Sequence, residues 1–114
     1  PLELRVLVIF GAVVGAVLTG LPFELWVSGE GAVQRWRPED LRERGVPGYR
    51  KHGMHLPEGA LATLRAWLRS DWWRMRRLSE LLVRRCGLDE LRVDWLLGDP
   101  RWGARVGELT YMGA

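Results

Sequence analysis

The sequence predicts an α+β fold, in which an amino-terminal β-hairpin or meander packs on a long amphipathic helix and is followed by a strand and a carboxy-terminal helix. Apolar residues alternate near the amino terminus, recur at helical spacing between residues 57 and 87, and alternate again after residue 90. A chain of 114 residues has the size of one domain, so 1-114 is expected to be a single domain. Because it begins with Pro1, it is expected to be a fragment of a longer protein.

The amino-terminal segment has two interpretations. Side chains alternate with period two from Leu2 to Phe10, which favours a strand, and Gly11 would let the chain turn and return within Val17 to Val27. The alternating run contains an acid and a base, which a membrane helix does not need. The uncharged stretch from Val6 to Phe23 is nevertheless close to the length of a membrane span. The pattern alone leaves a hairpin and a spanning helix equally open.

Shorter elements are predicted in the middle of the chain. Ser28 to Gly31 has turn chemistry, and Ala32 to Trp36 would add a short third strand. Pro38 to Arg44 indicates one or two helical turns, because proline suits the first helical position. The segment from Gly45 to Pro57 is rich in glycine and proline and is predicted to be a loop.

A long helix is predicted to begin at Pro57 and to end at Gly87, a length of about 42 Å at 1.5 Å per residue. Apolar residues recur at three- and four-residue steps and form one stripe, which is expected to be the core-facing side. The stripe consists of Leu61, Leu64, Leu68, Trp72, Met75, Leu78, Leu82 and Cys86.

The opposite side of this helix carries the candidate binding residues Arg69, Trp73, Arg77 and Arg84. Trp73 lies four residues from Arg69 and from Arg77, so guanidinium groups could flank its indole ring. A tryptophan among arginines suits an anionic membrane surface or an acidic protein partner. The alternative is a solvated surface on which Glu80 pairs with neighbouring arginines.

The segment from Leu91 to Leu97 has the clearest strand pattern, and Gly98, Asp99 and Pro100 follow it as a structural corner. Asp99 is expected to cap a helix rather than to act as a catalytic acid, because Pro100 suits the first helical position. The expected closing helix would present three apolar residues on one side, namely Trp102, Val106 and Leu109.

These carboxy-terminal features carry a family resemblance. A long basic helix, a strand of the LRVDWLLG kind, a Gly-Asp-Pro corner and a GELTYMG-like continuation are similar to the DUF2953 family of uncharacterised, membrane-anchored bacterial proteins, found largely in endospore formers. The resemblance covers Leu78 to Gly107, with a looser match from Leu2 to Gly11. It implies a membrane anchor before Pro1 and an amino-terminal hairpin. It implies no activity and no catalytic residue.

No residue pattern indicates a catalytic or metal site. His52 and His55 lie three residues apart, but a metal site needs three or four converging ligands. Cys86 lacks a designated base and is expected to face the core. No cofactor, no small-molecule substrate and no enzymatic activity are therefore expected.

The sequence leads to a non-enzymatic domain of a membrane-associated bacterial protein, with a role in the envelope or in sporulation. Its expected partner is an anionic membrane surface or another protein, and its oligomeric state stays open. Two alternatives remain, a small integral membrane protein whose Val6 to Phe23 segment spans the bilayer and a nucleic-acid-binding module that uses the arginine-rich helix. A net charge of +3 and the absence of a binding motif argue against nucleic acid.

Overall fold

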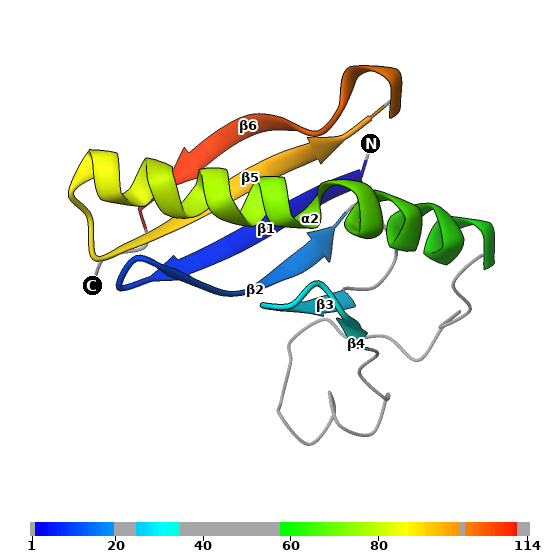
Figure 1. Cartoon of the computed structure of the whole chain (residues 1–114), viewed down its shortest axis with the longest axis horizontal. Coiled ribbons are helices and arrows are strands. Elements are labelled where there is room, and N and C mark those ends of the chain that lie inside the picture. Colours follow the sequence, from blue (N-terminus) through cyan, green and yellow to red (C-terminus); the bar gives the residue numbers. More distant parts are fainter. Residues whose placement is uncertain (1, 20–24, 35–57, 99, 112–114) are drawn as a thin grey trace.

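The computed structural model describes residues 2–19, 25–34, 58–98 and 100–111, which form one antiparallel sheet with a long helix across one face (Figure 1). The sheet has the strand order β4-β3-β2-β1-β5-β6. The strands are β1 (Leu2–Ile9), β2 (Ala12–Thr19), β3 (Leu25–Ser28), β4 (Val33–Gln34), β5 (Glu90–Leu97) and β6 (Arg105–Thr110). The helices are α2 (Glu58–Cys86) and the short 3₁₀ helix η1 (Pro100–Trp102).

The amino-terminal hairpin is confirmed. β1 pairs with β2 in an antiparallel register that includes Glu3 opposite Thr19, and β2 then pairs with β3. The spanning-helix alternative for Val6 to Phe23 is wrong, because residues 6–19 of that segment belong to these strands and their turn. The return strand also begins earlier than predicted, at Ala12, because the chain reverses within two residues after Ile9.

The alternation in β1 works as predicted up to the turn. Leu4, Val6 and Val8 are fully buried on the side that faces the helix. The pattern ends before Phe10, which was expected to continue the strand but lies in the turn with a φ of 49° and is 85% exposed. β1 lies between β2 and β5, so its buried side is at the centre of the core.

The long helix is confirmed within a residue of its predicted ends. Leu64, Leu68, Trp72 and Met75 of the predicted stripe are buried against the sheet. Cys86 is exposed, contrary to prediction, because the last helical turn has left the core and residues 84–87 are all exposed. Towards the carboxy-terminal end of α2, the fully buried positions are Ser79 and Val83, whereas the predicted positions Leu78 and Leu82 are only partly buried.

The predicted carboxy-terminal helix is wrong. Pro100 begins η1, which lasts a single turn to Trp102, and the chain then forms β6. β5 offers a free edge of backbone groups, and pairing with it satisfies the backbone of Arg105–Thr110. The helical spacing of Val106 and Leu109 misled the prediction, because a β-bulge opposite Asp94 and Trp95 gives these residues the same face of a strand.

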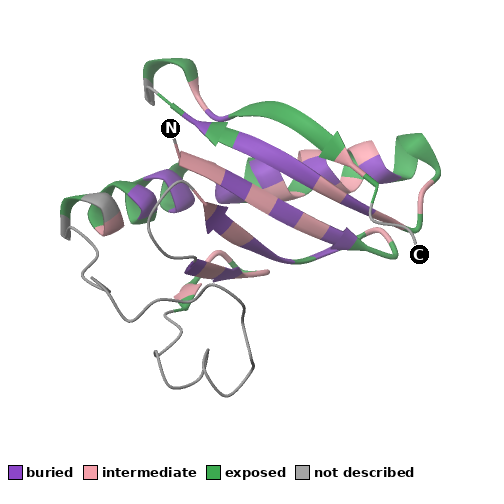
Figure 2. Ribbon diagram, turned by 180° about the vertical axis from the view of Figure 1, so that it is seen from behind, coloured by how far each residue is buried: buried purple, intermediate pink, exposed green. Residues whose placement is uncertain are grey.

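The strands of the sheet differ in how far they are buried. Viewed from the side opposite α2, β1 alternates between buried and partly exposed residues, whereas β6 is exposed along nearly all of its length (Figure 2). Asp94 is buried on this face of β5, where Arg92 donates two hydrogen bonds to its carboxylate at 2.8 and 2.9 Å. The pairing offsets the cost of burying the carboxylate charge.

Candidate functional site

Helix α2 is a fixed platform for the candidate residues. Its carboxy-terminal end is closed by Gly87, which has a φ of 67° and donates its N–H to the carbonyl of Arg84 at 3.2 Å. The N–H of Leu88 reaches the carbonyl of Val83 at 3.3 Å. These two bonds form a Schellman motif, which satisfies carbonyl groups that a helix end otherwise leaves unpaired.

All four candidate residues lie on the exposed surface of α2, and two of them, Arg69 and Trp73, also line a groove between the helix and the β3–β4 turn. Arg69, Arg77 and Arg84 are exposed, and Trp73 is 64% exposed. We call this set, Arg69, Trp73, Arg77 and Arg84, the basic face. It extends over about 22 Å of the helix at 1.5 Å per residue. The helix therefore presents the four side chains together, as their spacing predicted.

The indole ring of Trp73 has a different cationic neighbour from the ones predicted. The guanidinium of Arg76 lies 5.4 Å from the ring centroid, a cation–π distance. Arg76 also donates a hydrogen bond of 2.6 Å to the carbonyl of Gly29 in the β3–β4 turn. Arg76 therefore connects α2 to the sheet and places a positive charge beside the exposed ring.

Two acidic residues of the helix, Asp71 and Glu80, are already engaged by neighbouring groups. Asp71 accepts hydrogen bonds from Arg74 at 2.9 and 2.7 Å, and these bonds hold the pKa of Asp71 below its ordinary value. Glu80 accepts a hydrogen bond of 3.0 Å from the backbone N–H of Val13 and lies 3.8 Å from Arg76. Neither carboxylate is available to neutralise the outward side of the helix.

Several arginines of α2 consequently keep their charge uncompensated. Five exposed arginines of the helix have no carboxylate within 4.0 Å of the guanidinium group among the described residues. These five are Arg65, Arg69, Arg77, Arg84 and Arg85. Of the three ion pairs expected for a solvated surface, Glu80 with Arg76, Arg77 or Arg84, the structure confirms the pair with Arg76. Among the described residues, Arg77 and Arg84 do not pair with Glu80.

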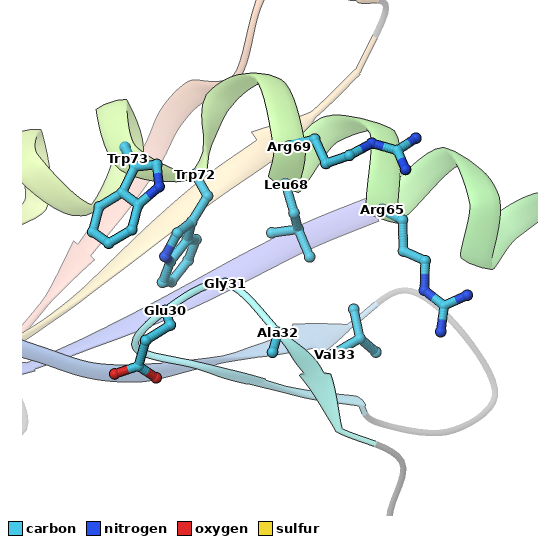
Figure 3. A pocket seen from close by; sticks show the side chains of 9 residues that line it. All are labelled: Glu30, Gly31, Ala32, Val33, Arg65, Leu68, Arg69, Trp72 and Trp73. Atoms are coloured by element: carbon cyan, nitrogen blue, oxygen red, sulfur yellow. The ribbon is translucent and has the colours of Figure 1, made fainter.

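A shallow groove of about 590 Å³ adjoins the basic face, between α2 and the β3–β4 turn. Figure 3 shows the indole of Trp72 reaching from the helix towards Gly31, with Arg65 at the far end of the groove. The indole N–H of Trp72 donates a hydrogen bond of 3.0 Å to the carbonyl of Gly29. The groove contains Glu30 as well as arginines, so its charge is mixed.

The other predicted positions contribute no site. Of the structural corner, Gly98 is exposed and Pro100 begins η1, while Asp99 lies outside the described residues, as do His52 and His55. Across the described residues, no group of three or more His, Cys, Asp or Glu side chains could hold a metal ion. Within the same residues, no helix is long and apolar enough to cross a membrane.

Comparisons with protein-family models, with curated proteins and with solved structures gave no match to this chain. The resemblance to the DUF2953 family therefore stays a prediction.

Sequence reasoning missed two features of the site. It did not single out Arg65 and Arg85, which extend the uncompensated charge beyond the basic face. It also did not identify Arg76 as the neighbour of Trp73, although a three-residue separation on a helix is as close as a four-residue one. The spacing of Trp73 and Arg76 could have predicted that they are close. The hydrogen bond to Gly29 that holds the Arg76 side chain in place could not be predicted, because it depends on the fold.

Proposed function

We propose that this domain is a non-enzymatic docking module, which holds a membrane-associated bacterial protein against an anionic lipid surface through the basic face of α2. The observation that carries the proposal is the uncompensated charge of Arg69, Arg77 and Arg84 beside an exposed Trp73. Arginine binds phosphate in a forked geometry, and tryptophan favours the headgroup region of a bilayer. A role in the envelope or in sporulation would agree with the family resemblance.

The expected strength of this contact is modest. Each arginine near an anionic membrane contributes about 1 kcal/mol, so the three arginines of the basic face supply roughly 3 kcal/mol before screening. Salt weakens the attraction, because the Debye length is about 8 Å at physiological ionic strength. Binding through charge alone would therefore be weak and reversible, and a second, apolar contact would be needed for a lasting attachment.

Nucleic acid is the competing polyanion. The arginines favour it as they favour lipid phosphate, but the exposed aromatic ring of Trp73 is a single one on this face rather than a row of stacking platforms. The mixed charge of the groove beside the helix also interrupts a continuous basic channel. We therefore favour anionic lipid over nucleic acid as the ligand of the basic face.

Vesicle sedimentation tests the proposal directly. The protein should sediment with vesicles that contain phosphatidylserine or phosphatidylglycerol and should stay in the supernatant with pure phosphatidylcholine. Raising the salt from about 0.05 M to about 0.5 M should release it, since the contact is electrostatic. Binding to duplex DNA without binding to anionic vesicles would replace the proposal with the nucleic-acid alternative.

A further inference from the structure

The tip of the β1–β2 hairpin has an unusual residue for its conformation. Phe10 and Gly11 form the two-residue turn, with φ values of 49° and 80°. Positive φ at both positions is the pattern of a type I′ turn, which strongly favours Asn, Asp or Gly at its first central position. Phe10 is the one residue other than glycine with a positive φ among the described residues.

This conformational cost is not offset by burial. The side chain of Phe10 is 85% exposed, and Ile9, the residue before it, is exposed as well. A large aromatic ring in a disfavoured conformation, without any packing to stabilise it, is an outlier from which a functional role is inferred.

The tip is also held in a fixed position relative to α2. The N–H of Phe10 donates a hydrogen bond of 2.6 Å to the carbonyl of Asp89, in the turn between α2 and β5. On the next strand, the N–H of Val13 donates to the carboxylate of Glu80 at 3.0 Å. Because the turn is held rigidly, the Phe10 ring can contact a binding surface without the entropy cost of first ordering a flexible loop.

The tip lies at the same end of the molecule as the carboxy-terminal end of α2, as Figure 1 shows. Arg84, from the basic face, and Arg85 are in the last turn of that helix. Asp89 and Glu90 follow immediately and reduce the net positive charge of this end. Attraction by charge is therefore limited there, and a close approach to a membrane must be stabilised by apolar contact.

We propose that Phe10 is a membrane-insertion residue, which enters the headgroup and upper acyl region of the anionic bilayer. This inference rests on the proposed function and supplies the apolar contact that the basic face lacks. Lipid is favoured over an apolar pocket of a protein partner because the basic face, which is proposed to bind lipid phosphate, ends with Arg84 at the same end of the molecule.

The decisive variant is Phe10→Asn. Asparagine is favoured in this turn position, so the variant should unfold at an equal or higher denaturant concentration than the wild type. Burying a phenylalanine stabilises by about 1.5–3 kcal/mol and each 1.4 kcal/mol is tenfold, so partitioning onto anionic vesicles should fall by about 10- to 100-fold. Phe10→Trp should keep the wild-type partitioning. A fold that is preserved or stabilised excludes misfolding as the cause of lost binding.

Trp102→Asn is the matched control. Trp102 is 67% exposed and lies in η1, which follows the far end of β5, away from the tip. Removal of the Trp102 ring should leave the partitioning of the protein onto anionic vesicles unchanged. If the wild type binds anionic vesicles and Phe10→Asn binds equally well, the insertion proposal is overturned, while the proposal that the basic face binds the vesicles is kept. Failure of the wild type to bind any anionic vesicle would overturn the proposed function, and insertion with it.

Discussion

The indole N–H of Trp95 donates a hydrogen bond of 2.9 Å to the hydroxyl of Ser79, and both side chains are almost fully buried between α2 and the sheet. Trp95 is on β5 and Ser79 is on the helix, so the bond joins the two layers at the centre of the core. Arg74 lies over the indole ring of Trp95, 5.6 Å from its centroid. This polar contact helps to fix the position of α2 and thus of its basic face.

Replacing Ser79 with alanine should destabilise the fold. The substitution removes the acceptor and leaves the Trp95 N–H buried without a partner, at a cost of about 1–3 kcal/mol. Urea denaturation of the purified variant measures the loss. Ser70→Ala is the control, because Ser70 is exposed and should change the free energy of unfolding by less than about 0.5 kcal/mol. Equal effects at the two serines would contradict this account of the core.

Truncation of Leu68 should have a larger effect. Leu68 is 5% exposed in the core, and Leu68→Ala should reduce the free energy of unfolding by roughly 2–5 kcal/mol. Leu81→Ala on the same helix should cost far less, because Leu81 is 43% exposed. A loss below about 0.5 kcal/mol at Leu68 would mean that this side of α2 does not face the core.

Two glycine substitutions separate backbone strain from steric contact. Gly11 and Gly31 both have positive φ, but an added Cβ at Gly11 meets nothing within 4 Å, whereas at Gly31 it would lie 2.6 Å from Cδ1 of Trp72. Gly11→Ala should cost about 1–2 kcal/mol from the left-handed conformation alone. Gly31→Ala should cost about 1–3 kcal/mol more through overpacking. Thermal unfolding of the two variants side by side measures the difference, which should vanish if Trp72 does not lie against this turn.

Acid should weaken the fold partly through Asp71. Hydrogen bonds from Arg74 lower the pKa of Asp71 below 3.8, its ordinary value. A group with a lowered folded-state pKa adds stability above the unfolded-state pKa, and this stability is lost as the pH falls through the folded-state pKa. The free energy of unfolding should therefore decline below about pH 4. Asp71→Asn should be less stable at neutral pH and should show a shallower decline, measured by denaturation at a series of pH values.

The sequence predicted the elements with the most regular periodicity. β1 and α2 were recognised because their buried residues repeat at the spacing of a strand and of a helix, with Val6 and Met75 as examples. The order of elements up to β5 followed from them. The basic face was also recognisable, since one side of a long helix can be derived from spacing alone.

The remaining features depend on contacts that are distant in sequence. β6 was mistaken for a helix because pairing with the free edge of β5 outweighs the local spacing of Val106 and Leu109. The exposure of Phe10 depends on a turn whose conformation its own residue type disfavours, so no propensity could have predicted it. The engagement of Glu80 by the backbone of Val13 likewise requires the hairpin to lie against the helix.

Charge reversal on the basic face tests the central claim most directly. Arg77→Glu combined with Arg84→Glu should abolish the salt-dependent sedimentation of the protein with anionic vesicles, because attraction is replaced by repulsion at two points of contact. Arg105→Glu is the control, because it reverses an exposed charge on β6, outside the basic face. It should reduce vesicle binding by much less for each charge reversed. Binding that is unchanged by the double substitution, or that falls equally for Arg105→Glu, would contradict the claim that this side of α2 docks on the membrane.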